Sequence, residues 1–209
     1  SFFIDSLNYD PPINVNSNTE NLYKIYVENL PSFYFGVTYV EDEIDTNFSC
    51  TSFIKMRNNY SSSQFDEHTE IENIKVTAVH EFFHSIQFGY NCYEKLWLME
   101  ATAVWSEDQL YNSINDLYRY MPSWFSNPQK SLNDESYHMY GSFIFFQYIS
   151  EHIGGRNTIR ECWDQSRILA NKYYDNSILA VDNALRSKNT TFNDTHYRMR
   201  IANLIMSNN

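Results

Sequence analysis

Long apolar runs are missing from this sequence of 209 residues, and so is a basic opening segment followed by an apolar one. A membrane-spanning helix needs roughly 18 or more consecutive apolar residues, and a secretory signal peptide needs the basic and apolar segments together. We therefore expect neither membrane insertion nor a signal peptide within this sequence, which opens on Ser1.

Basic residues are also scarce, with 15 Lys and Arg against 26 Asp and Glu, so that the formal net charge is -11. A surplus of negative charge repels the phosphate backbone of nucleic acids and the headgroups of anionic lipids. The composition therefore argues against nucleic acid as a partner. It leaves peptides, proteins and small molecules as candidate ligands, and it says nothing about the oligomeric state.

Cysteine occurs only three times, as Cys50, Cys92 and Cys162, and the spacing matches neither a zinc ribbon nor a C-x-x-C motif. Such a set is compatible with one disulfide and one free thiol, or with three reduced thiols. A zinc site built on cysteines is not expected.

Aromatic residues are abundant instead, with 17 Tyr, 15 Phe and 4 Trp, and 209 residues suit a single domain with an aromatic-rich core. No internal repeat or linker divides the chain. We expect an extended stretch over residues 1–21, a β-rich part over 22–58 and a helical part over 69–207. Strands that precede helices in this way predict an α+β domain.

Three β-rich runs, LYKIYVENL, FYFGVTYVE and CTSFIKMRN, predict a small sheet ahead of a long helix. Thr69 and Glu72 fit the capping box T-x-x-E at the start of that helix, and Gly89 is a candidate for its end. The apolar residues lie on more than one helical face, which predicts a buried central helix.

This helix carries His80, Glu81 and His84, which form H-E-x-x-H. One turn is 3.6 residues, so the two imidazoles lie on one face, roughly 6 Å apart along the axis, and both reach one metal ion. Glu81 points about a quarter of a turn away, where it suits a general base better than a ligand. The alternative is that an amphipathic helix contains the motif by chance.

A catalytic zinc ion needs a third protein ligand, and Glu100 in WLMEATAVW is the best candidate. Ala101 and Ala103 flank it and allow its helix to approach the first one closely. Glu107 lies two turns further along the same face, where its carboxylate can hold the second nitrogen of a ligand histidine. The alternative makes Glu100 and Glu107 an exposed acidic stripe.

Other ligand patterns fit less well. The longer motif H-E-x-x-H-x-x-G-x-x-H is excluded because Gln87 and Tyr90 stand where glycine and the third histidine are needed. Cys92 falls beyond the expected helix end. We interpret His68, beside Asp66 in a polar loop, as a solvated side chain.

The motifs resemble those of the gluzincins, the zinc peptidases typified by thermolysin and the aminopeptidase N group. HEFFH matches their two-histidine helix, and WLMEATAVWSED resembles the pattern W-L-x-E-G-x-A, with Ala101 in place of glycine. The chain from residue 22 to 165 is also similar to a group of uncharacterised secreted metalloprotease-like proteins, mostly bacterial. The resemblance implies a zincin catalytic domain, a secreted or surface location, Zn²⁺ as the metal and a peptide or protein substrate.

In such a peptidase a metal-activated water attacks the peptide bond and Glu81 is the general base. The resemblance further implies an aromatic or histidine donor to the oxyanion, for which we consider Tyr140, then Tyr137, then His138. It also implies an edge strand that binds an extended substrate, and CTSFIKMRN is our candidate. The rival hypothesis is a non-catalytic surface or binding protein that keeps the fold, with a structural metal or none.

Overall fold

The protein begins with a three-stranded sheet and continues as a set of helices, which makes it an α+β structure. The structure is a computed structural model that describes residues 2–13, 22–44 and 48–206. The strands are β1 (Ile25–Glu28), β2 (Gly36–Ile44) and β3 (Ser49–Arg57), and the helices are α1 (Glu70–Asn91), α2 (Leu96–Tyr111), α3 (Met121–Ser126), α4 (His138–Gly141), α5 (Phe143–His152), α6 (Asn157–Ile168), α7 (Ser177–Arg186) and α8 (Phe192–Met206). Short 3-10 helices span Ser63–Phe65 and Asp116–Tyr120.

The strand order in the sheet is β1-β3-β2, so β3 lies in the middle. β1 pairs with β3 in parallel and β2 pairs with β3 antiparallel, with Gly36 opposite Met56 and Thr38 opposite Ile54. The prediction that CTSFIKMRN is an edge strand is therefore wrong. This run is the most buried of the three because it has a partner on both sides, whereas β2 has only β3 beside it among the described residues.

Helix α1 begins where the sequence predicts. Thr69 accepts a hydrogen bond from the backbone of Glu72, and the Glu72 carboxylate accepts one from the backbone of Thr69. The predicted end at Gly89 is wrong, because the helix continues to Asn91 with Cys92 as its cap. Tyr90 and Asn91 are buried, and tertiary packing of this last turn outweighs the local tendency of glycine to end a helix.

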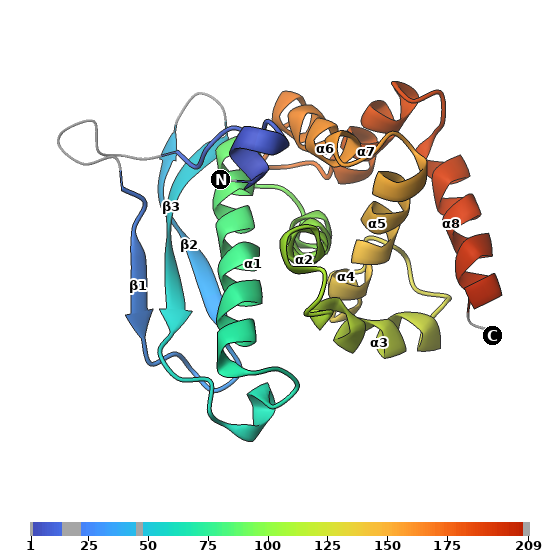
Figure 1. Cartoon of the computed structure of the whole chain (residues 1–209). Coiled ribbons are helices and arrows are strands. Elements are labelled where there is room, and N and C mark those ends of the chain that lie inside the picture. Colours follow the sequence, from blue (N-terminus) through green and yellow to red (C-terminus); the bar gives the residue numbers. More distant parts are fainter. Residues whose placement is uncertain (1, 14–21, 45–47, 207–209) are drawn as a thin grey trace.

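α1 lies between the sheet on one side and α2 on the other, as Figure 1 shows. Its buried side chains include Val79, Phe83 and Ile86, so the predicted buried central helix is present. α2 is buried along nearly its whole length, because α5 and α4 cover the faces that α1 leaves free. Trp97 and Trp105 of α2 are fully buried, in agreement with the expected aromatic core.

The first residues do not form the extended stretch that the sequence predicts. Phe2–Ser6 is a π-helical turn, and Phe3, Leu7 and Tyr9 are buried in the core. The ring of Phe3 packs edge-on against Phe83 of α1, with 5.2 Å between the ring centres. Burial of these apolar side chains in the core explains why the segment is folded and not extended. The remainder of the predicted stretch, residues 14–21, lies outside the described residues.

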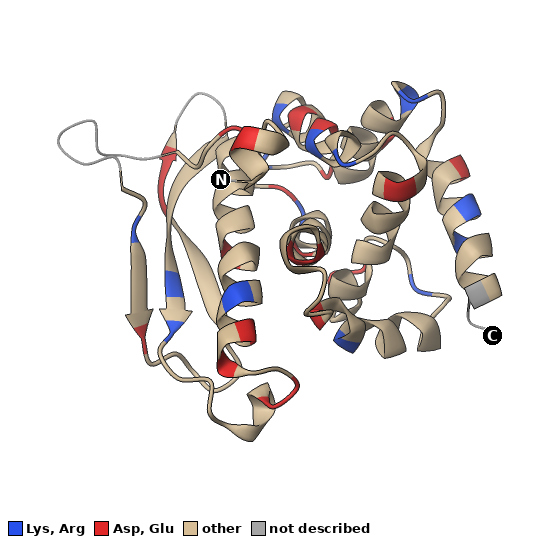
Figure 2. Ribbon diagram, viewed as in Figure 1, with Lys and Arg blue, Asp and Glu red and all other residues tan. Residues whose placement is uncertain are grey.

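Figure 2 shows Lys and Arg positions spread among the acidic ones over the sheet and the helices. Among the described residues, no helix is both long enough and apolar enough to cross a lipid bilayer.

A disulfide joins Cys50 in β3 to Cys92 at the end of α1, and Cys162 is a buried free thiol. The bond links positions 42 residues apart, so it restricts the unfolded chain strongly. We expect the double variant Cys50→Ser/Cys92→Ser to lose about 4 kcal/mol of unfolding free energy, as measured by urea denaturation. A reducing agent should destabilise the parent to the same level and leave the double variant unchanged. Equal stability of parent and double variant without reductant would contradict this.

Candidate metal centre

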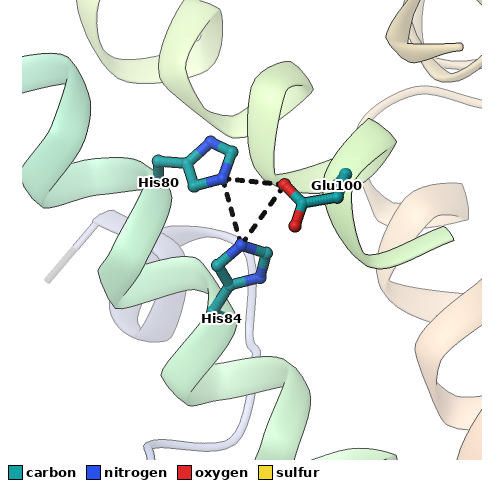
Figure 3. A group of neighbouring side chains, drawn as sticks. All are labelled: His80, His84 and Glu100. Atoms are coloured by element: carbon teal, nitrogen blue, oxygen red, sulfur yellow. Dashed lines mark hydrogen bonds and ion pairs between the residues drawn. The ribbon is translucent and has the colours of Figure 1, made fainter. Parts of the chain in front are cut away.

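Two packed helices bring His80, His84 and Glu100 together (Figure 3). Nε2 of His80 lies 3.0 Å from Nε2 of His84 and 3.1 Å from Oε2 of Glu100, and His84 Nε2 lies 3.6 Å from the same carboxylate oxygen. The two histidines come from successive turns of α1, and Glu100 comes from α2, whose flanking Ala101 and Ala103 are fully buried. Small side chains at these positions allow the close approach of the helices.

The outer nitrogen of each imidazole is held by a hydrogen-bond acceptor. Nδ1 of His80 lies 2.7 Å from Oε1 of Glu107, and Nδ1 of His84 lies 2.7 Å from Oε1 of Gln87. An amide oxygen only accepts hydrogen bonds, so His84 carries its proton on Nδ1. With Nδ1 protonated, Nε2 presents a lone pair toward the centre of the group, which is the tautomer that binds a metal.

Burial and the neighbouring charges shift the pKa values of His80, Glu107 and Glu100. Burial lowers the pKa of His80, but hydrogen bonds to Glu100 and Glu107 outweigh it and raise the pKa well above its usual value. Burial raises the pKa of Glu107 to about 7, although its hydrogen bond to His80 acts in the opposite direction. Burial also raises the pKa of Glu100, but the charges and hydrogen bonds of His84 and His80 hold it well below its usual range.

The donor set fits a small divalent ion. Two imidazole nitrogens and one carboxylate oxygen, all within 4.8 Å of one another, are a usual set for catalytic zinc. In a tetrahedral site with bonds of about 2.0–2.1 Å, ligand atoms lie roughly 3.3 Å apart, and the three measured separations bracket that value. Three electron-pair donors that face one another this closely repel unless a cation or protons lie between them.

Glu81 stands beside this group without joining it. It is buried, and its Oε2 accepts a hydrogen bond of 2.7 Å from Oγ1 of Thr38 in β2. The Thr38 hydroxyl also lies 2.9 Å from the backbone oxygen of Glu81. The Glu81 carboxylate therefore contacts the sheet side of α1, whereas His80 and His84 contact Glu100 of α2.

A cleft of about 390 Å³ opens over Glu81 and His80. The cleft is lined by α1, by Glu107 of α2, by the segment from Phe33 into β2, by the 3-10 helix Asp116–Tyr120, and by Tyr137 and Tyr140. Six of the 14 lining residues are Phe or Tyr, so aromatic rings form a large part of its surface. Arg119 also lines the cleft, but ion pairs hold it to Glu67 and Asp116.

Two of the three predicted oxyanion donors line the cleft. Tyr140 is partly buried, and burial together with the charges of Glu100 and Glu81 raises its pKa, so that its hydroxyl keeps its proton and can donate. Tyr137 is 55 % exposed at the mouth of the cleft. The ring of Tyr120, which the sequence did not suggest, stacks on Tyr140 with 5.2 Å between ring centres.

His138, the third candidate for the oxyanion donor, does not line this cleft. The side chain is buried, and its ring stacks on Trp124 with 4.6 Å between ring centres. α4 is a single turn from His138 to Gly141, so adjacent side chains diverge by about 100° around its axis. Tyr140 consequently faces the cleft and His138 faces the core.

His68 is not the solvated side chain that the sequence suggests. Its Nε2 lies 3.1 Å from Oδ1 of Asp116, a buried carboxylate that also pairs with Arg119. The reason is that the polar loop before α1 folds against the 3-10 helix that follows α2, a contact between distant parts of the chain. His152 is the last residue of α5 and is exposed.

Three contacts at the site escaped the sequence analysis. Gln87 lies three residues after His84, and side chains at this spacing are neighbours on one helical face. The hydrogen bond between Gln87 and His84 could therefore have been predicted from the sequence. Thr38 and Gly36 belong to β2, more than 40 residues before Glu81. No local pattern indicates which strand residue will lie against Glu81.

Comparison with known proteins identifies a family for this chain, and the function of that family is unknown. The model of a family of unknown function, DUF6055, matches residues 65–204, which include the three donors, Glu81 and Glu107. No curated protein and no solved structure matches the chain.

Gln87 connects the two helices of the site, because its Nε2 donates to the backbone oxygen of Met99 and to Thr102. We expect Gln87→Leu to weaken Zn²⁺ binding roughly 10- to 100-fold, because His84 loses the acceptor that fixes its tautomer. Calorimetric titration with Zn²⁺ measures this effect. Gln87→Glu keeps an acceptor and should bind far better than the leucine variant, and Gln147→Leu on α5 is the matched control. Unchanged affinity in Gln87→Leu would contradict the assigned role.

Proposed function

The chain belongs to the DUF6055 family of unknown function, and from the geometry of its site we propose that it is a zinc-dependent peptide hydrolase of the gluzincin type. The observation that carries the proposal is the convergence of two Nε2 atoms and one carboxylate oxygen within 4.8 Å, next to a glutamate that is not part of the group. A purely structural site has no use for a separate carboxylate beside its ligands, whereas hydrolysis needs a base there.

His80, His84 and Glu100 would hold the metal. Zn²⁺ suits two imidazoles and one carboxylate, since harder ions such as Mg²⁺ and Ca²⁺ prefer a shell of oxygen ligands. A zinc ion in this place would polarise the scissile carbonyl and lower the pKa of a coordinated water toward about 7. Glu107 and Gln87 orient the histidines by accepting hydrogen bonds from their Nδ1 atoms.

Glu81 is the general base in this proposal. Thr38 donates to its Oε2, so we assign Oε1 to accept the proton of the attacking water and to return it to the leaving amine. Because Glu81 is buried at the floor of the cleft, its carboxylate acts with little competition from bulk water.

Tyr140 is the donor that we assign to the developing oxyanion. It lines the same cleft as Glu81 and His80, and its raised pKa keeps the phenol protonated at neutral pH. The stacked ring of Tyr120 limits the directions in which the Tyr140 side chain can move. Tyr137 is the second choice because it is more exposed.

The substrate would be an extended peptide that pairs with β2. The edge of β2 that has no partner among the described residues would pair with the substrate. β2 replaces CTSFIKMRN (β3) in this role, because β2 borders the cleft and β3 has partners on both sides. The side chain beside the scissile bond would be apolar or aromatic. Phe33, Phe35 and Tyr120 line the cleft. Arg119 is the one Lys or Arg that lines it among the described residues, and it already forms ion pairs with two carboxylates.

A secreted or surface location fits this reading. The Cys50–Cys92 disulfide is typical of proteins that mature in an oxidising compartment. The helix pair that carries the motif and Glu100, together with a sheet beside the first helix, supports the zincin architecture that the sequence motifs suggest.

Glutamate variants separate metal binding from hydrolysis. Glu81→Gln should retain stoichiometric zinc and lose peptide hydrolysis by roughly 10²- to 10⁴-fold, because the base is removed and the ligands remain. Glu100→Gln should bind zinc more weakly and lose activity in parallel. Metal analysis and cleavage of a peptide mixture measure the two effects, with Glu161→Gln on α6 as the control. Cleavage that survives both Glu81→Gln and a chelator would sink the proposal.

Tyrosine variants test the oxyanion donor. Tyr140→Phe should lower kcat roughly 100-fold without loss of zinc, because one hydrogen bond to the developing negative charge disappears. Tyr137→Phe, at the exposed mouth of the same cleft, should have an effect of less than about threefold. The reverse order of the two effects in steady-state kinetics would transfer the role to Tyr137.

A further inference from the structure

A hydroxyl group of β2 contacts Glu81 of α1. Oγ1 of Thr38 lies 2.7 Å from Oε2 of Glu81 and 2.9 Å from the backbone oxygen of the same residue. Thr38 is half-buried in the part of β2 that pairs regularly with β3, before the irregularity between Val40 and Glu43. The rotamer of a β-branched side chain in a regular strand is restricted, so the hydroxyl occupies a defined position.

Two residues earlier, Gly36 faces the same carboxylate. A Cβ atom at Gly36 would lie 2.8 Å from Cγ of Glu81, 3.2 Å from its Oε1 and 2.8 Å from Cγ2 of Thr77. Real Cβ atoms essentially never approach another heavy atom so closely, so any larger residue would displace Glu81 or the strand. Side chains two positions apart point to the same face of a strand, which explains why both positions meet Glu81.

We propose that Thr38 and Gly36 of β2 together position the carboxylate of Glu81, Thr38 by donating a hydrogen bond and Gly36 by leaving room, an inference that rests on the proposed function. Both are positioning residues, because neither reaches the metal ligands. The edge strand is then part of the catalytic apparatus as well as a binding surface. A peptide that pairs with β2 would restrict the movement of this strand, and the strand in turn positions the carboxylate of Glu81.

A merely structural role for Thr38 would look different. The Thr38 hydroxyl carries one proton and has two acceptors within reach, the carboxylate and the backbone oxygen of Glu81. If it only tied the sheet to α1, the contact with the backbone oxygen would suffice. Loss of the hydroxyl would then lower stability and leave the place of the Glu81 side chain and the turnover rate unchanged.

The test compares Thr38→Val, which keeps the shape and removes the hydroxyl, with Thr38→Ser, which keeps the hydroxyl. We expect Thr38→Val to lower kcat roughly 10- to 100-fold with KM and zinc content within about twofold of the parent, and Thr38→Ser to recover most of the rate. Thr158→Val in α6 removes a hydroxyl that donates to a backbone oxygen far from the site and is the matched control. Gly36→Ala should also lower kcat while zinc is retained.

A crystal structure of zinc-loaded Thr38→Val supplies a readout that does not depend on activity. We expect the Glu81 carboxylate to leave the position that it has in the parent. A carboxylate that stays in place, or a Thr38→Val variant with full kcat, overturns the inference while Glu81→Gln still tests the proposed function by itself. Should the parent prove inactive on peptides, the proposed function fails, and the crystal structures still decide whether Thr38 positions Glu81.

Discussion

The burial of three electron-pair donors against one another is the constraint on which the rest of the structure depends. His80, His84 and Glu100 are largely removed from water, and polar groups in such a place are costly unless each has a partner. Each imidazole has one on its outer nitrogen, and the inner nitrogens share the carboxylate. This pairing requires α1 and α2 to lie close together, so the geometry of the site depends on the packing of these two helices.

The outer partners also explain why the helices keep their alignment. Gln87 accepts from His84 and donates to the backbone of α2 at Met99, the residue before Glu100. Glu107 accepts from His80 two turns beyond Glu100. A slide of α2 along α1 would break both contacts at once. Each of these hydrogen bonds contributes little to stability by itself. Together they connect α1 to α2 at two places, and this favours a single alignment of the two helices.

The features that the sequence could predict are those governed by neighbours along the chain. The capping box at Thr69 and the shared face of His80 and His84 follow from helical geometry, and Glu100 follows from the need for a third ligand. The position of β3 in the sheet depends on pairing between distant segments, which the strand pattern alone does not encode. The orientation of His138 depends on how α4 packs against Trp124 of α3, and the contact of Thr38 with Glu81 depends on how the sheet lies on α1.

In the proposed mechanism the two parts of the fold have different roles. The helix pair supplies the three donors of the candidate metal centre, and the sheet supplies the hydrogen bond from Thr38 and the space at Gly36 beside Glu81. Metal binding alone would not require β2, whereas the proposed hydrolysis would require β2 to lie against Glu81 of α1. The Cys50–Cys92 disulfide joins the central strand β3 to the end of α1, so a covalent bond connects the sheet to the helix that carries Glu81.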